Sequence, residues 1–152
     1  MKLVEFILSD GLRHSAYSKR HWLIEYCINR SLWACLQYRV ANSVYKSELP
    51  IIIKKPVLIL MVLWQYIIEW ITTIKLPYKC EIGKGLYIGH PNCIILNANA
   101  VIGNYCNLSQ GVTIGVSGIG ENRGVPVIGD FVYVGANATI AGKISIGDEC
   151  IV

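Results

Sequence analysis

The 152-residue sequence is poor in charged residues, histidine and metal-binding motifs. Only 16% of its residues are charged and 53% are hydrophobic, so the chain is too apolar to be disordered and should bury a substantial core. Its six cysteines and three histidines form no C-x-x-C pair and no zinc-ligand spacing, so we expect free thiols and no metal. The first ten residues lack the basic and apolar regions of a secretory signal. We therefore expect a cytoplasmic protein.

The basic residues are concentrated in the first half of the chain. Ten of the 14 Lys and Arg residues lie in residues 1–75 beside five acidic ones, whereas residues 76–152 hold four basic and five acidic residues. A basic and apolar segment suits an anionic membrane surface or a phosphate-bearing acceptor, although a solvated basic face gives the same pattern. Because the charges lack the interleaved aromatic residues of a nucleic-acid groove, we expect no nucleic-acid partner.

A six-residue repeat organises the second half of the chain. Aliphatic residues recur every six positions, with two extra residues after Ile88 and a longer gap after Ile114. The residue that follows each aliphatic one is glycine at seven of eleven positions and is small or turn-prone at the others. The aliphatic column is Leu76, Ile82, Ile88, Leu96, Ile102, Leu108, Ile114, Ile128, Val134, Ile140, Ile146 and Val152.

This pattern predicts a solenoid of short strands that alternate with corners. The aliphatic side chains should point inward and stack between coils, while glycine permits the tight corner. A third column, four residues after each aliphatic position, should also face inward; it includes Cys80, Cys106 and Cys150, which then act as small hydrophobic residues. The repeat runs to Val152 without a polar cap, so we expect the natural protein to continue or a partner to cover this end.

Residues 1–75 are predicted to be helical. The apolar spacing over Trp22–Val44 is close to that of an amphipathic helix, which Ser47–Pro50 interrupts. The segment Pro56–Ile74 reaches nineteen residues only if its polar side chains are included, and a span needs about 20. It could pack on the solenoid or in a subunit interface, lie in a membrane interface with Trp64 and Trp70 at headgroup depth, or cross the membrane.

The stretch from Leu76 to Val152 resembles the serine acetyltransferase group of left-handed hexapeptide-repeat acyltransferases, and looks most like the branch that O-acetylates capsular or exopolysaccharide sugars. The residues that carry the resemblance are IGKGLYIGH, Ile82–His90; ILNANAVIGNYCNLSQGVTIG, Ile95–Gly115; and PVIGDFVYVGANATIAGKISIGD, Pro126–Asp148. The resemblance implies an α+β chain with N-terminal helices (1–75) followed by a left-handed parallel β-helix (76–152). It also implies a homotrimer with active sites between subunits, and acetyl-CoA as cosubstrate without a metal.

In that family the two-residue interruption carries the catalytic histidine. Here the interruption holds His90, which is the one histidine within residues 76–152. An imidazole with an ordinary pKa near 6.5 can take a hydroxyl proton at neutral pH. The resemblance therefore implies that His90 is the general base of acetyl transfer; a satisfied polar side chain at a turn is the alternative.

The second interruption, Val116–Val127, has a family-like length. By the resemblance, this loop crosses to the neighbouring subunit and helps frame the acetyl-CoA site. The predicted coenzyme contacts are Gly115, Ser117, Gly118 and Ala136, because glycine lets the backbone approach the pantetheine and offer N–H donors. Simple corner positions are the alternative for these residues.

Several positions depart from the serine-specific pattern. Those family members have an Asp immediately before the catalytic histidine and a second Asp fourteen residues further upstream; here the two positions hold Gly89 and Lys75. Their Arg-His-Pro becomes Gly124–Pro126, with Arg123 displaced by one residue. We therefore expect a sugar hydroxyl of a glycan as acceptor, contacted by Asn92 and Arg123. Serine O-acetylation in cysteine biosynthesis is the alternative.

Three other functions fit less well. Cys93 lies three residues from His90 and could act as a nucleophile, but it has no evident base of its own. A carbonic anhydrase needs several histidines for zinc, and the solenoid has one. A non-catalytic scaffold predicts no special residue in the short interruption, where His90 stands. Binding of coenzyme A distinguishes the scaffold from the enzyme.

Overall fold

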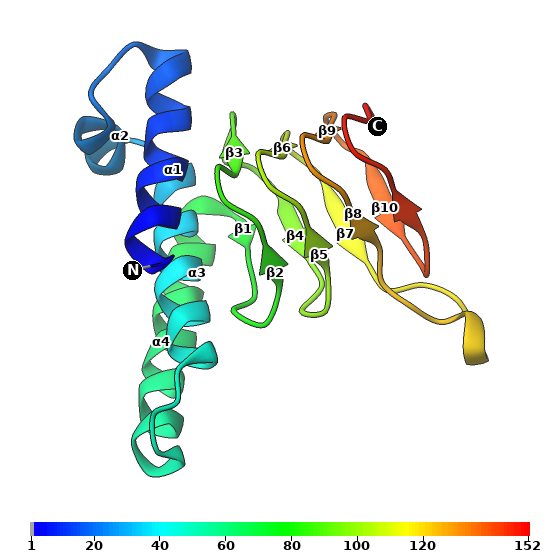
Figure 1. Ribbon diagram of the computed structural model, residues 1–152, viewed down its shortest axis with the longest axis horizontal. Helices are drawn as coiled ribbons and strands as arrows, with labels where there is room; N and C mark the ends of the chain where they lie inside the picture. Colours follow the sequence, from blue (N-terminus) through cyan, green and yellow to red (C-terminus); the bar gives the residue numbers. More distant parts are fainter. Residues whose placement is uncertain (1) are drawn as a thin grey trace.

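The structure is a computed structural model that describes residues 2–152, with helices first and parallel strands after them. The helices of this region are α1 (Lys2–Ser18), α2 (Trp22–Ile28), α3 (Arg30–Lys46) and α4 (Ile51–Thr72), with a short 3₁₀ helix at Gly120–Asn122. The strands are β1 (Ile74–Lys75), β2 (Glu81–Ile82), β3 (Tyr87–Ile88), β4 (Ile94–Leu96), β5 (Val101–Ile102), β6 (Asn107–Leu108), β7 (Thr113–Gly115), β8 (Val127–Ile128), β9 (Tyr133–Val134), β10 (Thr139–Ala141) and β11 (Ser145–Ile146). The helices stand side by side at one end of the stacked coils (Figure 1).

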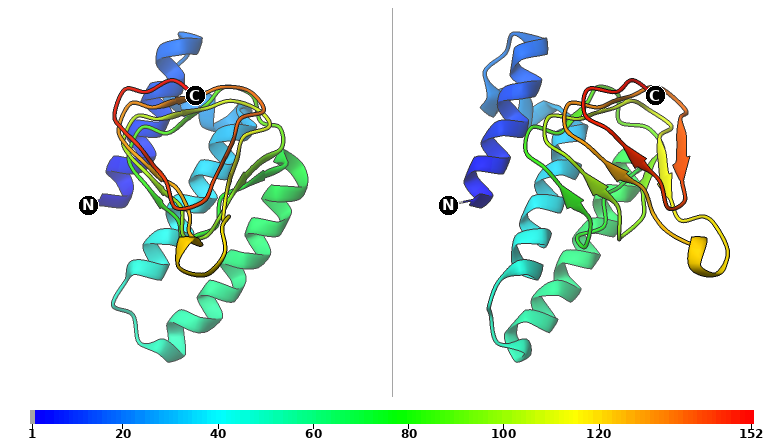
Figure 2. Two further views of the ribbon diagram at one scale, coloured as in Figure 1. Left: turned by 90° about the vertical axis from the view of Figure 1, so that its right-hand side faces the viewer. Right: turned by 45° about the vertical axis from the view of Figure 1, so that its right-hand side comes forward.

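The strands form three parallel sheets, one for each side of a triangular solenoid (Figure 2). Sheet A has the order β1-β4-β7-β10, sheet B has β11-β8-β5-β2, and sheet C has β3-β6-β9. A regular coil consists of three hexads, as the pairing of Ile95 with Thr113 shows. The coil that joins Tyr87 to its partner Asn107 also contains the short interruption, and the coil that joins Asn107 to Tyr133 contains the long one. The two interruptions of the repeat are therefore extra residues within otherwise regular coils.

The predicted aliphatic column forms the core of the solenoid. Ten of its twelve members are buried, whereas Ile146 is half-buried and Val152 is 44% exposed on the last coil. In the third column Cys80 and Cys106 are buried, as predicted. The Cys80 thiol donates to the carbonyl of Asn97 at 2.9 Å, and burial raises the pKa of Cys80 to about 12. These two cysteines therefore pack as small hydrophobic residues.

The glycine column lies at the strand ends, where each corner begins, but it does not supply the left-handed backbone of the corner. Left-handed backbone occurs three residues after the aliphatic position instead, at Gly85, Tyr105, Phe131 and Glu149. Gly83, Gly103 and Gly129 of this column are required by the close approach of successive coils, whereas Gly115 and Gly147 have room for a Cβ. A Cβ on Gly103, for example, would lie 2.5 Å from the carbonyl carbon of Gly129 in the next coil.

The prediction of a continuous helix over Trp22–Val44 was wrong in its first third, where Asn29 separates α2 from α3. Asn29 has extended backbone, its N–H donates to the carbonyl of Glu25 at 2.8 Å, and its side chain accepts from the N–H of Ser31 at 3.0 Å. One residue thus ends α2 and caps α3. The break turns the chain while the apolar spacing continues on both sides of it, so the periodicity did not reveal it.

Helix α4 begins at Ile51, five residues before the apolar segment that we predicted, and includes Pro56. Its inner side packs on α3 and β1, and Trp64 packs against the core while Trp70 is 86% exposed. Of the two tryptophans that we considered for a membrane interface, Trp70 alone faces outward. Among the described residues, α4 is the one helix long and apolar enough to cross a membrane.

Side chains of α1 and α3 cap the first coil of the solenoid. The carboxylate of Asp10 accepts from the backbone N–H of Leu86 at 2.9 Å and from Nε and Nη2 of Arg39 at 2.9 and 3.1 Å. Arg39 also donates to the carbonyls of Ile82 and Gly83, both at 2.6 Å. A strand edge without a neighbour exposes unpaired backbone groups, and the helices supply the partners here. Further bonds to this coil come from Ser9, His14, Tyr38 and Asn42.

Candidate active site

His90 lies after β3, in the two-residue interruption, and lines a small cavity of about 160 Å³. The cavity opens on the outer face of sheet C, and the hydroxyl of Ser109 donates to that of Tyr133 at 3.3 Å on its wall. Its other lining residues are Tyr87, Gly89, Asn107 and Leu108. The cavity therefore combines an imidazole with hydroxyl and amide groups and two aromatic rings.

The polar and aromatic neighbours of His90 were not predicted from the sequence. Tyr87, Asn107 and Tyr133 each precede a residue of the aliphatic column, so they point outward, and strand pairing places them side by side. The signal was present as a column of outward-facing residues. It could have been found only after each interruption had been assigned to its coil, because both spacings are longer than the three hexads of a regular coil.

The imidazole of His90 is exposed and makes no hydrogen bond to any of residues 2–152. The two positions where serine-specific enzymes carry Asp supply no carboxylate here. Gly89 has no side chain, and Nζ of Lys75 lies 3.9 Å from Oε1 of Glu69, at the end of α4. The ring of His90 is thus accessible to a hydroxyl group that enters the cavity.

Strand β3, which leads to His90, is hydrogen-bonded to His14 of α1. The buried His14 ring has Nδ1 2.9 Å from the carbonyl of Asp10, and its Nε2 is 3.3 Å from the carbonyl and 3.5 Å from the N–H of Ile88. Its centroid lies 4.7 Å from that of Tyr87. Burial lowers the pKa of His14, so its ring is neutral at neutral pH. The helices thus position the edge of the cavity.

Asn92, a predicted acceptor contact, is not among the residues that line the His90 cavity. Its carbonyl accepts from the N–H of Gly111 at 2.9 Å, and its Oδ1 lies 3.4 Å from Oγ1 of Thr73 at the end of α4. The same hydroxyl oxygen accepts from the N–H of Cys93 at 2.9 Å. These contacts fix the return of the chain to β4 and leave the Cys93 side chain exposed.

The long interruption projects from the solenoid as a closed loop, yellow in Figure 2. Ser117 and Gly124 close its base with two backbone hydrogen bonds of 3.1 and 3.0 Å. Gly118 has φ of 95°, and a Cβ there would lie 2.8 Å from the carbonyl carbon of Asn122. Arg123 is exposed beyond the 3₁₀ helix. Glycine at position 118 is therefore required by the turn of this loop.

The predicted site residues fall into two groups on one chain. Gly115 ends β7 and leads to Ser117 and Gly118, whereas His90 and Ala136 lie in turns that precede strands of the same sheet A. Because the strands of this sheet are parallel, the two groups lie at opposite ends of it. A single chain therefore does not bring the predicted coenzyme contacts of the loop into the cavity of His90.

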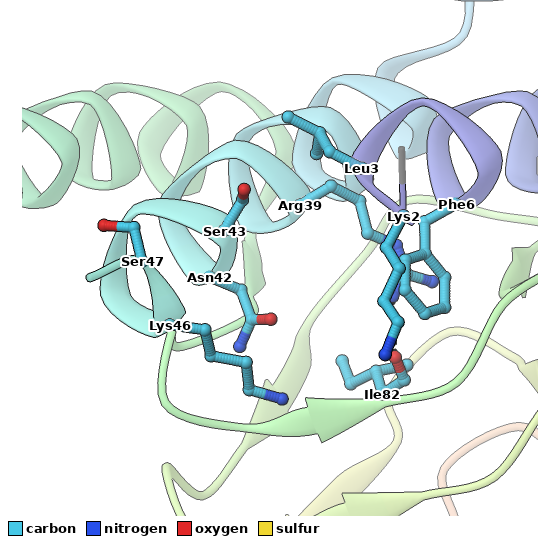
Figure 3. A pocket seen from close by; sticks show the side chains of 9 residues that line it. All are labelled: Lys2, Leu3, Phe6, Arg39, Asn42, Ser43, Lys46, Ser47 and Ile82. Carbon is cyan, nitrogen blue, oxygen red and sulfur yellow. Dashed lines mark hydrogen bonds between the residues drawn. The ribbon is translucent and has the colours of Figure 1, made fainter. Parts of the chain in front are cut away.

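A larger cavity of about 550 Å³ lies between α1, α3 and the first coil (Figure 3). It shares no residue with the predicted site. Its Arg39 is bound to Asp10, and its Lys46 has Nζ 3.7 Å from Oε1 of Glu81, so two of its cations are already paired. The other lining residues are Lys2, Leu3, Phe6, Asn42, Ser43, Ser47 and Ile82. Within residues 2–152 no group of three or more His, Cys, Asp or Glu could hold a metal ion.

The chain is similar in sequence to serine acetyltransferases. It is 30% identical to that of Synechococcus elongatus over 116 residues, which covers 76% of this chain and 44% of the relative. It is 29% identical to that of Helicobacter pylori over 146 residues, which covers 96% of this chain and 80% of the relative. The chain spans about half the length of the cyanobacterial relatives. No protein-family model matches.

Solved serine acetyltransferases share the fold. The Neisseria gonorrhoeae enzyme in complex with serine aligns with a TM-score of 0.80 at 24% identity, over 99% of this chain and 59% of that one. A serine acetyltransferase in complex with CoA aligns with a TM-score of 0.78 at 21% identity, over 98% and 59% of the two chains. The matches support the general resemblance; they do not support the polysaccharide branch that we expected.

Proposed function

We propose that this protein transfers the acetyl group of acetyl-CoA to a hydroxyl group, with His90 as general base and L-serine as the acceptor. The observation that carries the proposal is the exposed imidazole of His90 in a cavity at the two-residue interruption of the solenoid. The similarity to serine acetyltransferases, one of them solved with serine and one with CoA, supports both substrates.

The chemistry requires one proton acceptor and one site for negative charge. A ring nitrogen of His90 takes the proton of the acceptor hydroxyl while the hydroxyl oxygen attacks the thioester carbonyl. Backbone N–H groups then stabilise the tetrahedral oxyanion, and the thiol of coenzyme A leaves with a proton. The His90 ring is exposed, so an acceptor hydroxyl can reach its ring nitrogens.

The coenzyme would bind along the loop that Ser117 and Gly124 close, beside Gly115 and Gly118. Arg123 and Lys143 are both exposed there, and the Nζ of Lys143 lies 3.5 Å from the carbonyl of Glu121, so the loop offers positive charge to phosphate groups. Because this loop and His90 lie at opposite ends of sheet A, the proposed site combines His90 of one subunit with the loop of another. We propose a homotrimer of left-handed solenoids as the assembly that does so.

A sugar hydroxyl is the second candidate acceptor, and two positions favour it. Gly89 and Lys75 stand where serine-specific enzymes carry carboxylates, so no acidic side chain is available to bind the ammonium group of serine beside His90. The cavity has aromatic walls instead, Tyr87 and Tyr133. An acceptor without an ammonium group would not need the two carboxylates that Gly89 and Lys75 replace.

The test is the release of coenzyme A thiol from acetyl-CoA in the presence of L-serine or of a panel of sugars. His90→Ala should lower turnover by about 10²–10⁴-fold, the usual contribution of a general base. His21→Ala is the matched control because His21 is also exposed, at the start of α2, away from the cavity. Turnover with L-serine that is lost in His90→Ala supports the proposal.

The outcomes separate the two acceptors. Turnover with a sugar but not with serine would replace serine and retain the role of His90. Unchanged turnover in His90→Ala would refute the general base. Loss of turnover in Cys93→Ala, with the His90 variant active, would favour the cysteine nucleophile that we set aside.

A further inference from the structure

The outer face of α4 is an uncovered apolar surface of unusual size. Ten exposed residues, none of them charged, share it: Ile52, Ile53, Pro56, Ile59, Leu60, Leu63, Tyr66, Ile67, Trp70 and Ile71. At 3.6 residues per turn they cover an arc of roughly 140°, and at 1.5 Å per residue the 22-residue helix is about 33 Å long. We call these ten residues the α4 face. A contiguous apolar patch of this extent marks an interaction surface.

We propose that the α4 face lies on the surface of an anionic membrane, with the helix parallel to the bilayer plane. The arc is wide even for a surface helix, whose core-facing apolar stripe covers at least about 100°. A bilayer interface can take up the whole arc, because the helix sinks into the boundary between headgroups and acyl chains. A partner helix would leave the flanks of the arc exposed.

The residues at the edges of the arc fit this orientation. Lys55 is exposed and is the one charged residue that borders the α4 face on its exposed side. The neighbouring Lys54 points away from the face, since its Nζ donates to the carbonyl of Ser47 at 2.7 Å, and no acidic residue lies within the arc. Tyr66, which is 62% exposed, lies on the same edge of the arc as Lys55, and tyrosine is enriched at the headgroup level of membranes. Positive charge at the edge of an apolar face matches anionic headgroups.

The opposite side of α4 excludes a spanning orientation. Ile68 and Thr72 are buried, and the amide of Gln37 on α3 donates to the carbonyl of Met61 at 3.1 Å. The first solenoid strand begins at Ile74, directly after the helix. If α4 crossed the bilayer, polar α3 with its buried Arg39 would have to enter with it. A helix that rests on the membrane by one face keeps these contacts.

The test is flotation of the purified chain with lipid vesicles, made either of phosphatidylcholine alone or of phosphatidylcholine with phosphatidylglycerol as the minor component. The wild type should bind the anionic vesicles. Leu63→Asp, at the centre of the α4 face, should weaken binding at least tenfold, because it places a charge in the apolar boundary. Val4→Asp is the matched control, since Val4 is 70% exposed on α1, outside the α4 face, and its replacement should change nothing.

The electrostatic part has its own variant. Lys55→Gln should weaken binding to anionic vesicles about fivefold and leave binding to neutral vesicles unchanged, because one lysine near such a surface contributes about that factor. His90→Ala should bind vesicles as the wild type does, so this inference and the proposed function can fail separately.

A wild type that does not float with anionic vesicles would overturn the proposal. If Leu63→Asp then lowers the molar mass of the protein measured by light scattering, a second copy of the chain covers the α4 face instead. Equal losses of vesicle binding in Leu63→Asp and Val4→Asp would also overturn it, because the effect would then follow from added charge rather than from this surface.

Discussion

Replacing Asp10 by asparagine should destabilise the protein by about 3–5 kcal/mol, the usual cost of leaving one charge of a buried ion pair without its partner. Asp10 is fully buried and Arg39 is 4% exposed, and the two share hydrogen bonds of 2.9 and 3.1 Å. In Asp10→Asn the guanidinium would keep the carbonyls of Ile82 and Gly83 and one neutral amide oxygen as acceptors, but no negative charge would balance it.

Thermal unfolding followed by circular dichroism measures this loss. For a chain of 152 residues, about 2–4 °C of melting temperature corresponds to each kcal/mol, so the midpoint should fall by roughly 6–20 °C. Glu5→Gln is the matched control, because Glu5 is on the same helix and pairs with Lys84 of the same coil at 3.3 Å. Both of these side chains are well exposed, and the control should cost less than about 1 kcal/mol.

The double variant Asp10→Asn with Arg39→Met tests the reasoning. If the cost of each single change arises from an unpaired buried charge, removing both charges should cost less than the sum of the two single changes. Strict additivity, or a loss in Asp10→Asn no larger than that of the Glu5→Gln control, would refute the assignment of the pair as the cap of the solenoid.

Burial lowers the pKa of His14, so below about pH 6.5 the unfolded chain takes up a proton that the folded chain does not, and stability should fall as pH drops. His14→Gln should reduce this slope in urea titrations between pH 7 and pH 5, and an unchanged slope would contradict it. Gly103→Ala places a Cβ 2.5 Å from a backbone carbon of the next coil and should cost about 1–3 kcal/mol. A Cβ on Gly147 would have Sγ of Cys150 as its nearest neighbour, at 4.0 Å, so Gly147→Ala should cost less than about 1 kcal/mol; equal losses in thermal melts would argue against close coil packing. A thiol reagent should label the exposed Cys27 and Cys93 rapidly and the buried Cys35, Cys80 and Cys106 slowly, as mass spectrometry can show; rapid labelling of these three would contradict their burial.

The solenoid core could be predicted because its physical cause is periodic. Each coil repeats the same three inward positions, so the sequence shows the same residue class every six positions. The ten members of the aliphatic column from Leu76 to Ile140 are buried, as this pattern predicts. The role of the glycines could not be predicted in the same way. A glycine column is compatible both with left-handed corners and with close stacking, and only coordinates show that Gly103 is limited by the neighbouring backbone.

The cap of the first coil was not predictable from one sequence. Asp10, His14 and Arg39 are ordinary polar residues of helices, and their spacing contains no sign that they face a strand edge far along the chain. What distinguishes them is burial, which depends on how α1 and α3 dock. The need for such a cap follows from the repeat itself, because a first coil has no preceding coil to bond.

The candidate site was predictable in one part and unpredictable in another. His90 could be located because an interruption of a regular repeat is visible in the sequence, but the two extra residues change the sequence spacing between residues that are neighbours in the sheet. Asn107 pairs with Tyr87, and Tyr133 with Asn107, because each interruption is accommodated within one coil, so both sequence spacings are longer than three hexads. The interruption therefore identifies His90 in the sequence, but it obscures which residues line the cavity. Once the two interruptions are assigned to their coils, the pairing of sheet C fixes which outward residues stand next to His90, and the acceptor must be read from those residues rather than from His90 alone.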